Sequence, residues 1–165
     1  MGFGKLIAKL GECQAIYREL HEIGLLKKKS IITGNMDELA HYNDQESSLL
    51  QAYTQLELER TQWMVALQQE RGLPVNPQMR LTELREALTL DEGLELAAAQ
   101  QRLADAVSAL QSISELNQQL IHQSIDYVDY SLEVMVGKSE TDYVYSNPNS
   151  RPTMNRRSSG LDYRT

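Results

Sequence analysis

Hydrophobic residues recur every three or four positions along most of the chain, which is the spacing of one face of an α-helix. The first periodic segment carries them at Phe3, Leu6, Leu10, Cys13, Tyr17 and Leu20. Gly34 suits the left-handed conformation that follows a helix end, and Asn35 can cap a second helix. Glu38, at the third position of that helix, completes a capping box. The pattern predicts two helices separated by a tight break at Gly34–Asn35.

The second helix is expected from Met36 to about Arg71, with Glu46 and Arg60 interrupting its apolar stripe. The segment "RGLPVNPQM" should end it and start a short third helix. That helix would have Asn76 as its cap and Pro77 as its first residue, and would run through Leu81, Leu84 and Leu88.

The last helix should begin at a capping box made by Thr89 and Glu92 and extend to about Val136, ending at Gly137. Large apolar residues fill its seam in the first half, whereas small or polar ones occupy the seam at Asn117, Ser124 and Ser131. This sustained periodicity predicts an all-α fold, an elongated antiparallel coiled-coil-like helical bundle formed by residues 1–137. Residues 138–165 have no helical period and are rich in Ser, Asn, Pro and Arg, so we expect a flexible, disordered C-terminal tail.

Charge and composition narrow the function classes. The 165-residue chain carries a net charge of −7, and the acidic excess lies in the segment before the tail. An acidic body is a poor ligand for nucleic acid, because neutralising phosphates supplies most of that affinity. The single cysteine, Cys13, excludes an internal disulfide, and no apolar run has the length of a signal peptide or membrane span.

The candidate chemistry is sparse. Glu38 and His41 form the Glu-x-x-His pair found in di-iron bundles, but neither other histidine has a Glu three residues before it. His122 could be a phosphoacceptor, yet Asp126 and Asp129 follow it and no Lys or Arg lies between Arg102 and Lys138. We therefore expect no catalytic, cofactor-binding or metal-binding site, and a protein that is not an enzyme.

The stretch "NQQLIHQSIDYVDYSL" of the last helix favours a binding role instead. Small seam residues leave room for an incoming helix, while aromatic and Met side chains adapt to its surface. The predicted partner-binding face consists of Asn117, Leu120, Ile121, Ser124, Tyr127, Val128, Ser131 and Met135.

The segments "KKKSIITGN", "QESSLL", "LELER" and "LNQQLI" follow one another along the chain. Their order and spacing resemble the FlgN-type flagellar export chaperones over about residues 5–145. "LNQQLI" resembles the Asn-x-x-Leu-Leu signature of that family, and "SLEVM" before a tyrosine-bearing tail follows the same order. The chain departs from the family pattern at Gln45, where a second acidic residue is usual, and in the basic tail beyond Asn149. The positions that match in the first half are Lys28, Lys29, Ile31, Ile32, Gly34, Asn35, Gln45, Glu46, Leu49, Leu50, Leu56, Glu57 and Arg60.

The resemblance implies a cytoplasmic chaperone of the flagellar type III export apparatus. Its partners would be the C-terminal helical segments of the hook-associated junction proteins FlgK and FlgL and the cytosolic domain of the export gate. Either Tyr143 or Tyr145 would contact the gate. The alternative is a structural or adaptor coiled coil that dimerises through the same apolar stripe. The preferred junction protein and any weak self-association of the free chain stay open.

Overall fold

The computed structural model describes residues 2–137, and the predicted tail lies outside the described residues. The described part is all-α and has no strand, which confirms the predicted fold class. Its helices are α1 (Gly2–Thr33), α2 (Met36–Glu70), α3 (Leu81–Arg85) and α4 (Leu90–Val136). The described residues divide into two units, one ending at Ile125 and the other beginning at Asp126, so the division falls within α4.

The turn between α1 and α2 is built as the sequence predicts, with one difference. Gly34 has φ +70°, its N–H donates to the Ile31 carbonyl (3.2 Å), and the Asn35 N–H donates to the Ser30 carbonyl (2.9 Å). These two bonds define a Schellman motif. The Asn35 side chain accepts from the Glu38 N–H at 3.2 Å. The predicted capping box is incomplete, because the Asn35 N–H is already bonded and the Glu38 carboxylate accepts from the Ser30 hydroxyl instead (3.2 Å).

Asn35→Ala should lower the free energy of unfolding by about 1 kcal/mol, because the Glu38 N–H would lose its side-chain acceptor. Chemical denaturation followed by circular dichroism measures the change. Asn43→Ala, at an exposed position inside α2, is the matched control and should not lower stability, because Ala has a higher helix propensity than Asn. Equal effects of the two substitutions would contradict the capping role.

The predicted start of the third helix is wrong. Helix α3 begins at Leu81, with Arg80 at the capping position, and Asn76 and Pro77 belong to a turn. The buried Gln68 side chain fixes this turn, since it donates to the Asn76 carbonyl (2.9 Å) and accepts from the Asn76 N–H (2.7 Å). The Asn76 side chain accepts from the Gln78 N–H at 3.0 Å, so it stabilises a local turn rather than a helix end.

The capping box that opens α4 is present as predicted. The Glu92 N–H donates to the Thr89 hydroxyl (3.3 Å), and the Thr89 N–H donates to the Glu92 carboxylate (3.1 Å). Arg71, just after α2, forms an ion pair with the same carboxylate. The backbone hydrogen bond from Thr89, followed by the bonds and charge of its other partners, lowers the pKa of Glu92. This cluster ties the start of α4 to the end of α2.

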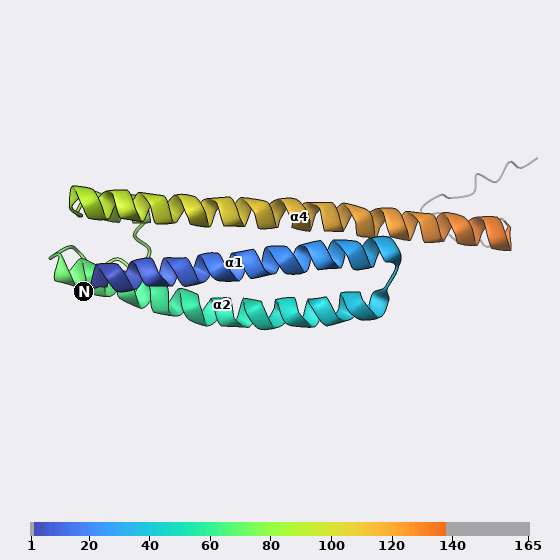
Figure 1. Ribbon diagram of the computed structural model, residues 1–165, viewed down its shortest axis with the longest axis horizontal. Helices are drawn as coiled ribbons and strands as arrows, with labels where there is room; N and C mark the ends of the chain where they lie inside the picture. Colours follow the sequence, from blue (N-terminus) through green and yellow to red (C-terminus); the bar gives the residue numbers. More distant parts are fainter. Residues whose placement is uncertain (1, 138–165) are drawn as a thin grey trace, which may run out of the picture. The chain divides into compact units, whose positions relative to one another are not determined.

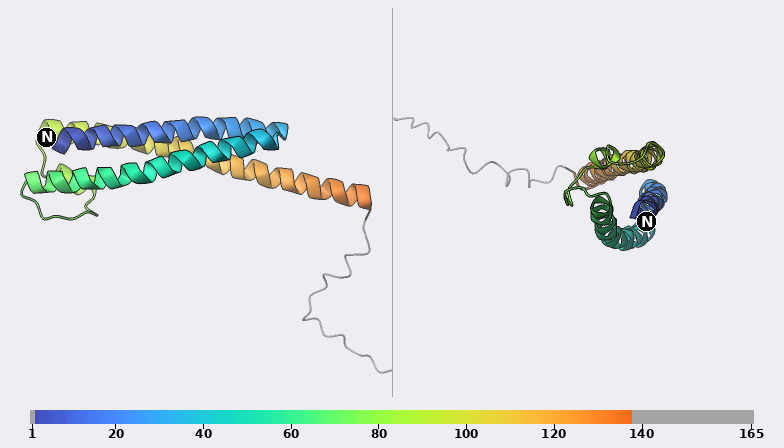
Figure 2. Two further views of the ribbon diagram at one scale, coloured as in Figure 1. Left: turned by 90° about the horizontal axis from the view of Figure 1, so that it is seen from below. Right: turned by 90° about the vertical axis from the view of Figure 1, so that its left-hand side faces the viewer.

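The hydrophobic core lies where all four helices meet, near the chain's N-terminus (Figure 1). α1 and α2 form an antiparallel hairpin, and α4 begins at the end of the hairpin opposite its turn (Figure 2). Burial of these side chains supplies the main driving force for folding the first unit. The core cluster consists of Phe3, Leu6, Leu10, Met64, Leu67, Leu84, Leu96 and Ala99.

Farther along the bundle, α4 approaches α1 closely at Gly24. A Cβ atom added at Gly24 would lie 2.8 Å from Ile113 Cγ2, a separation that real Cβ atoms do not adopt. One step on, the Asn117 side-chain amide donates to the Gly24 carbonyl at 2.9 Å. The missing side chain at Gly24 therefore permits the contact between the two helices.

Candidate partner-binding surface

The second half of α4 exposes a long run of apolar side chains. The buried residues of α4 end at Asn117, and large apolar side chains after it are open to solvent. Val128 is 53% exposed and Met135 is 82% exposed. A monomer rarely exposes so much contiguous apolar surface unless that surface binds something. The exposed large apolar residues of this half are Ile121, Ile125, Tyr127, Val128, Tyr130, Leu132, Val134, Met135 and Val136.

Most of the predicted partner-binding residues are accessible, and one is not. Ile121, Ser124, Tyr127, Val128 and Met135 are exposed, and Leu120 and Ser131 are half-buried. Asn117 is buried, because its side chain packs against α1 at Gly24. The expectation that Asn117 lines an open face therefore needs correction. Tyr143 and Tyr145 lie outside the described residues.

The two seam serines are small and already satisfied within their own helix. The Ser124 hydroxyl donates to the Leu120 carbonyl (2.8 Å), and the Ser131 hydroxyl donates to the Tyr127 carbonyl (2.7 Å). A partner that covers them would not have to supply a hydrogen bond, which keeps the cost of their burial low. The seam can therefore act as a shallow, adaptable surface for an apolar partner.

Acidic side chains lie on the opposite side of the same helix. At 100° per residue, Asp126, Asp129 and Glu133 cluster on one side of α4, while Ser124, Val128 and Ser131 lie on the other. The segment is thus amphipathic along its length, although its apolar face is wide. Such a face is suited to pack against another amphipathic helix.

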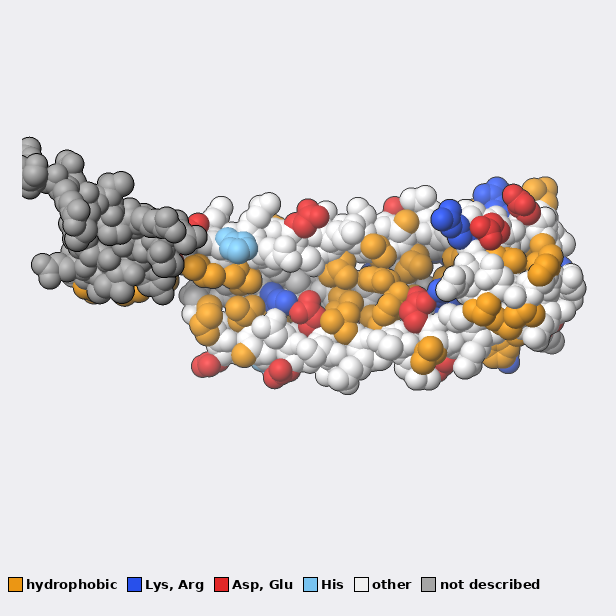
Figure 3. All heavy atoms as spheres, turned by 180° about the vertical axis from the view of Figure 1, so that it is seen from behind, with side chains coloured by type: hydrophobic (Ala, Val, Ile, Leu, Met, Phe, Trp, Pro, Cys, Tyr) orange, Lys and Arg blue, Asp and Glu red, His pale blue; other side chains and the backbone are white. Residues whose placement is uncertain are grey.

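Inside the first unit, the polar residues that interrupt the α2 stripe are paired rather than free. Lys27 of α1 forms an ion pair with Glu46 (2.7 Å), and Arg60 forms one with Glu57 (2.8 Å). The Tyr53 hydroxyl donates to Glu57 at 2.7 Å. These side chains are half-buried. Figure 3 shows one face of the molecule, on which hydrophobic side chains form a row with isolated charged groups between them.

The electrostatics of Glu57 follow from this environment. Burial raises its pKa, but the hydrogen bonds from Arg60 and Tyr53 outweigh burial and leave the pKa below its usual value. Because the folded pKa is depressed, the stabilisation is present above the unfolded pKa of Glu57 and is lost as the pH falls through the folded pKa.

Cys13 should not react with a thiol reagent in the folded protein. Burial, and then the negative charge of Glu57, raise the pKa of the Cys13 thiol to about 11. At about pH 8 only about one thiol in a thousand would be thiolate, the reactive form. We expect Ellman's reagent to react with Cys13 only after the chain is unfolded in guanidinium. A fast reaction without denaturant would contradict this, and Cys13→Ser provides the blank.

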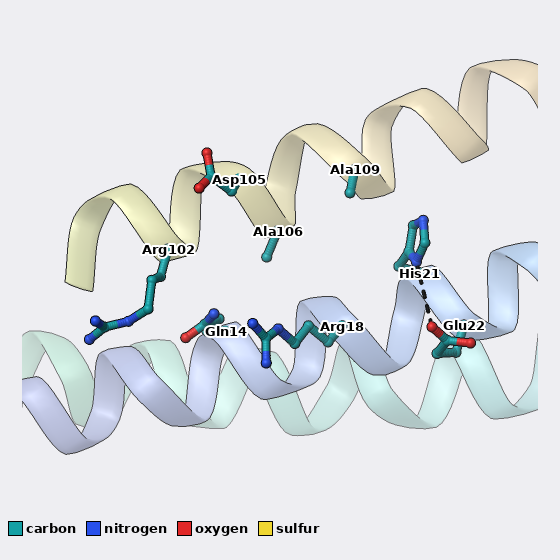
Figure 4. Close-up of a pocket in the computed structure, with 8 residues that line it drawn as sticks. All are labelled: Gln14, Arg18, His21, Glu22, Arg102, Asp105, Ala106 and Ala109. Atoms are coloured by element: carbon teal, nitrogen blue, oxygen red, sulfur yellow. Dashed lines mark ion pairs between the residues drawn. The ribbon is translucent and has the colours of Figure 1, made fainter. Parts of the chain in front are cut away.

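A cavity of about 380 Å³ lies between α1 and α4 (Figure 4). Gln14 and Arg18 come from α1, and Arg102 and Ala106 come from α4. His21 lies 3.8 Å from the Glu22 carboxylate on the same helix. The lining mixes both signs of charge and contains no Ser, Thr, Cys or Tyr that a base could activate. The cavity has no arrangement suited to nucleophilic catalysis.

The metal and phosphotransfer candidates gain no support from the geometry. The Glu38 carboxylate bonds Ser30, whereas the His41 ring bonds the Gln45 side chain at 3.1 Å. Among residues 2–137, no group of three His, Cys, Asp or Glu side chains comes together as metal ligands. His122 is exposed on α4. No helix in this part of the chain is long and apolar enough to cross a membrane.

Comparison with known proteins gives one match. The sequence profile described as FlgN protein matches residues 1–152, which is most of the chain. No curated protein and no solved structure matches. The match covers all four helices and agrees with the resemblance carried by the motifs around Gly34, Arg60 and Asn117. The family comprises chaperones rather than enzymes. The chain belongs to the FlgN family of flagellar export chaperones.

Proposed function

We propose that this protein is a cytoplasmic chaperone that binds the C-terminal helical segments of the hook-associated junction proteins FlgK and FlgL. It would prevent their premature assembly and deliver them to the export gate of the flagellar type III apparatus. The observation that carries the proposal is the exposed apolar face of α4 after Asn117. Family membership supports the export-chaperone role, and the exposed face supports a helical cargo.

The exposed apolar face of α4 suits the kind of segment that such a chaperone has to cover. A segment that assembles through coiled-coil contacts carries an apolar stripe, and that stripe must be covered while the subunit waits for export. Ile121, Val128 and Met135 offer a complementary stripe at helical spacing, and the self-satisfied serines between them leave space for cargo side chains. The chaperone would thus replace, for a time, the neighbour that the cargo meets in the assembled structure.

The test is titration of purified full-length protein with C-terminal peptides of FlgK and FlgL by isothermal calorimetry. We expect one peptide to bind per chain, with a negative change in heat capacity, since binding buries apolar surface. A scrambled peptide of the same composition is the control. Absence of binding together with a concentration-dependent dimer mass would favour the adaptor coiled coil, because that dimer would occupy its own apolar face.

The tail gives a separate prediction about the gate. We propose that Tyr143 and Tyr145 contact the cytosolic domain of the export gate, since tyrosine combines an apolar ring with a polar tip suited to a pocket. Replacing both with Ala should change cargo affinity by less than about twofold, which corresponds to about 0.4 kcal/mol of binding free energy. Gate binding and export of the junction proteins should fall.

Each single replacement identifies which tyrosine contributes. Equal loss of cargo and gate binding in the double variant would contradict a division of labour between body and tail. Normal export would remove both tyrosines from the mechanism.

A further inference from the structure

Asn117 leaves a buried hydrogen-bond acceptor unpaired. The side chain is 6% exposed, and its amide nitrogen donates to the Gly24 carbonyl at 2.9 Å. Its Oδ1 has no hydrogen-bond partner within the described part of the chain. An acceptor buried without a donor lowers stability, because it loses its bond to water and gains none in return. The α1–α4 contact therefore contains a polar group that weakens it.

Asn117 is the last buried residue of α4. Leu96, Ala106 and Ile113 precede it on the buried side of α4, and no residue of α4 after it is buried. The heptad seam nevertheless continues through Leu120, and α1 itself continues from Gly24 to Thr33. Leu120 is only half-buried and residues 121–130 are exposed, so burial along α4 falls off just after the polar layer.

We infer that Asn117 is a positioning residue for the proposed cargo surface. Its unpaired oxygen ends the packing of α4 on α1 and so keeps the following face of α4 free for an amphipathic helix of the partner. A polar group at one seam position of a coiled coil is known to fix register at a cost in stability. This inference rests on the proposed function, and it changes the role of Asn117 from a cargo contact to a determinant of where the cargo surface begins.

The occupant is a partner helix rather than a second copy of this chain. Asp126, Asp129 and Glu133 lie opposite the apolar face and would not meet in a dimer formed through it, so charge does not select the occupant. Membership in the FlgN family selects it, because that family implies binding of flagellar export substrates.

Three variants of the full-length chain test the inference. Asn117→Leu replaces the amide with an apolar group of nearly equal size. Asn117→Ala removes the amide without extending the apolar seam. Gln118→Leu makes a similar change at the exposed neighbouring position and is the matched control. Each is measured for Tm, for amide hydrogen exchange of residues 118–125, and for affinity toward a C-terminal FlgK peptide.

For Asn117→Leu we expect Tm to rise by about 3 °C, exchange in residues 118–125 to slow, and peptide affinity to fall about tenfold. Asn117→Ala should lower Tm while leaving affinity within about twofold, and Gln118→Leu should change neither by more than that. A gain in stability together with a loss of binding is a result that a purely structural role would not produce.

Other outcomes overturn the inference. Asn117→Leu could lower Tm, or it could raise Tm without changing exchange or affinity; in either case Asn117 does not limit the packing. If the wild-type chain binds no junction peptide, the proposed function fails, and the exchange measurement alone still decides whether Asn117 ends the α1–α4 contact. A wild-type dimer that Asn117→Leu converts to monomer would identify a second copy as the occupant and overturn the partner-helix assignment.

Discussion

Leu96→Ala is expected to lower the free energy of unfolding by about 3 kcal/mol. Leu96 is fully buried and joins α4 to the core cluster formed with Leu6, Leu67 and Leu84. Truncation removes apolar contacts and leaves a cavity that the surrounding long helices cannot collapse to fill. Guanidinium denaturation monitored by circular dichroism measures the effect, which is a large part of the stability of a typical domain.

Leu94→Ala is the matched control for this prediction. Leu94→Ala is the same chemical change on the same helix, but the Leu94 side chain is 57% exposed. We expect its effect to stay below about 0.5 kcal/mol. Comparable losses for the two variants would mean that the first unit is not organised around the core described for it.

Val128→Asp is expected to weaken cargo peptide binding by at least about thirtyfold, or about 2 kcal/mol. A carboxylate at the centre of the apolar face would be buried without a partner when cargo covers it. The free protein should keep its helices, because Val128 is already half exposed and supports no core contact. Calorimetric titration measures the affinity, and circular dichroism reports the helical content.

His122→Asp places the same carboxylate on the opposite side of α4, beside Asp126 and Asp129. This control should bind the peptide with an affinity within about threefold of wild type. If the two variants lose affinity equally, the apolar stripe does not define the docking side. If neither loses affinity, the cargo surface lies elsewhere on the chain.

Local sequence chemistry was sufficient to predict most helix boundaries. Gly34 and Asn35 end one helix and cap the next, and Thr89 caps α4, because each acts on backbone groups within a few residues of itself. Asn76 followed by Pro77 has the same local pattern as a helix start, but the distant Gln68 holds the Asn76 backbone in a turn. A pattern confined to neighbouring residues could not reveal that contact.

The candidate partner-binding surface also depends on a contact that a pattern of neighbouring residues could not reveal. Periodicity places Asn117, Ser124 and Ser131 at equivalent seam positions, and it treats all three as residues of one face. Only Asn117 meets Gly24, a residue far away in the chain, and is buried by it. Likewise, Glu46 reads as an interruption of its stripe until Lys27 is found opposite it. The sequence did contain one indication of that contact, because residues of opposite charge occupy seam positions on both α1 and α2.

The short turn at Gly34–Asn35 also bears on the order in which the protein folds. Because α1 and α2 are separated by these two residues, bringing the helices together costs little loop-closure entropy. α4 begins about twenty residues after α2 ends, so its contacts with α1 join positions much farther apart in the chain. The α1–α2 hairpin should therefore form first, with α4 docking onto it afterwards, and the helix that carries the proposed cargo face would be the last to fold during synthesis.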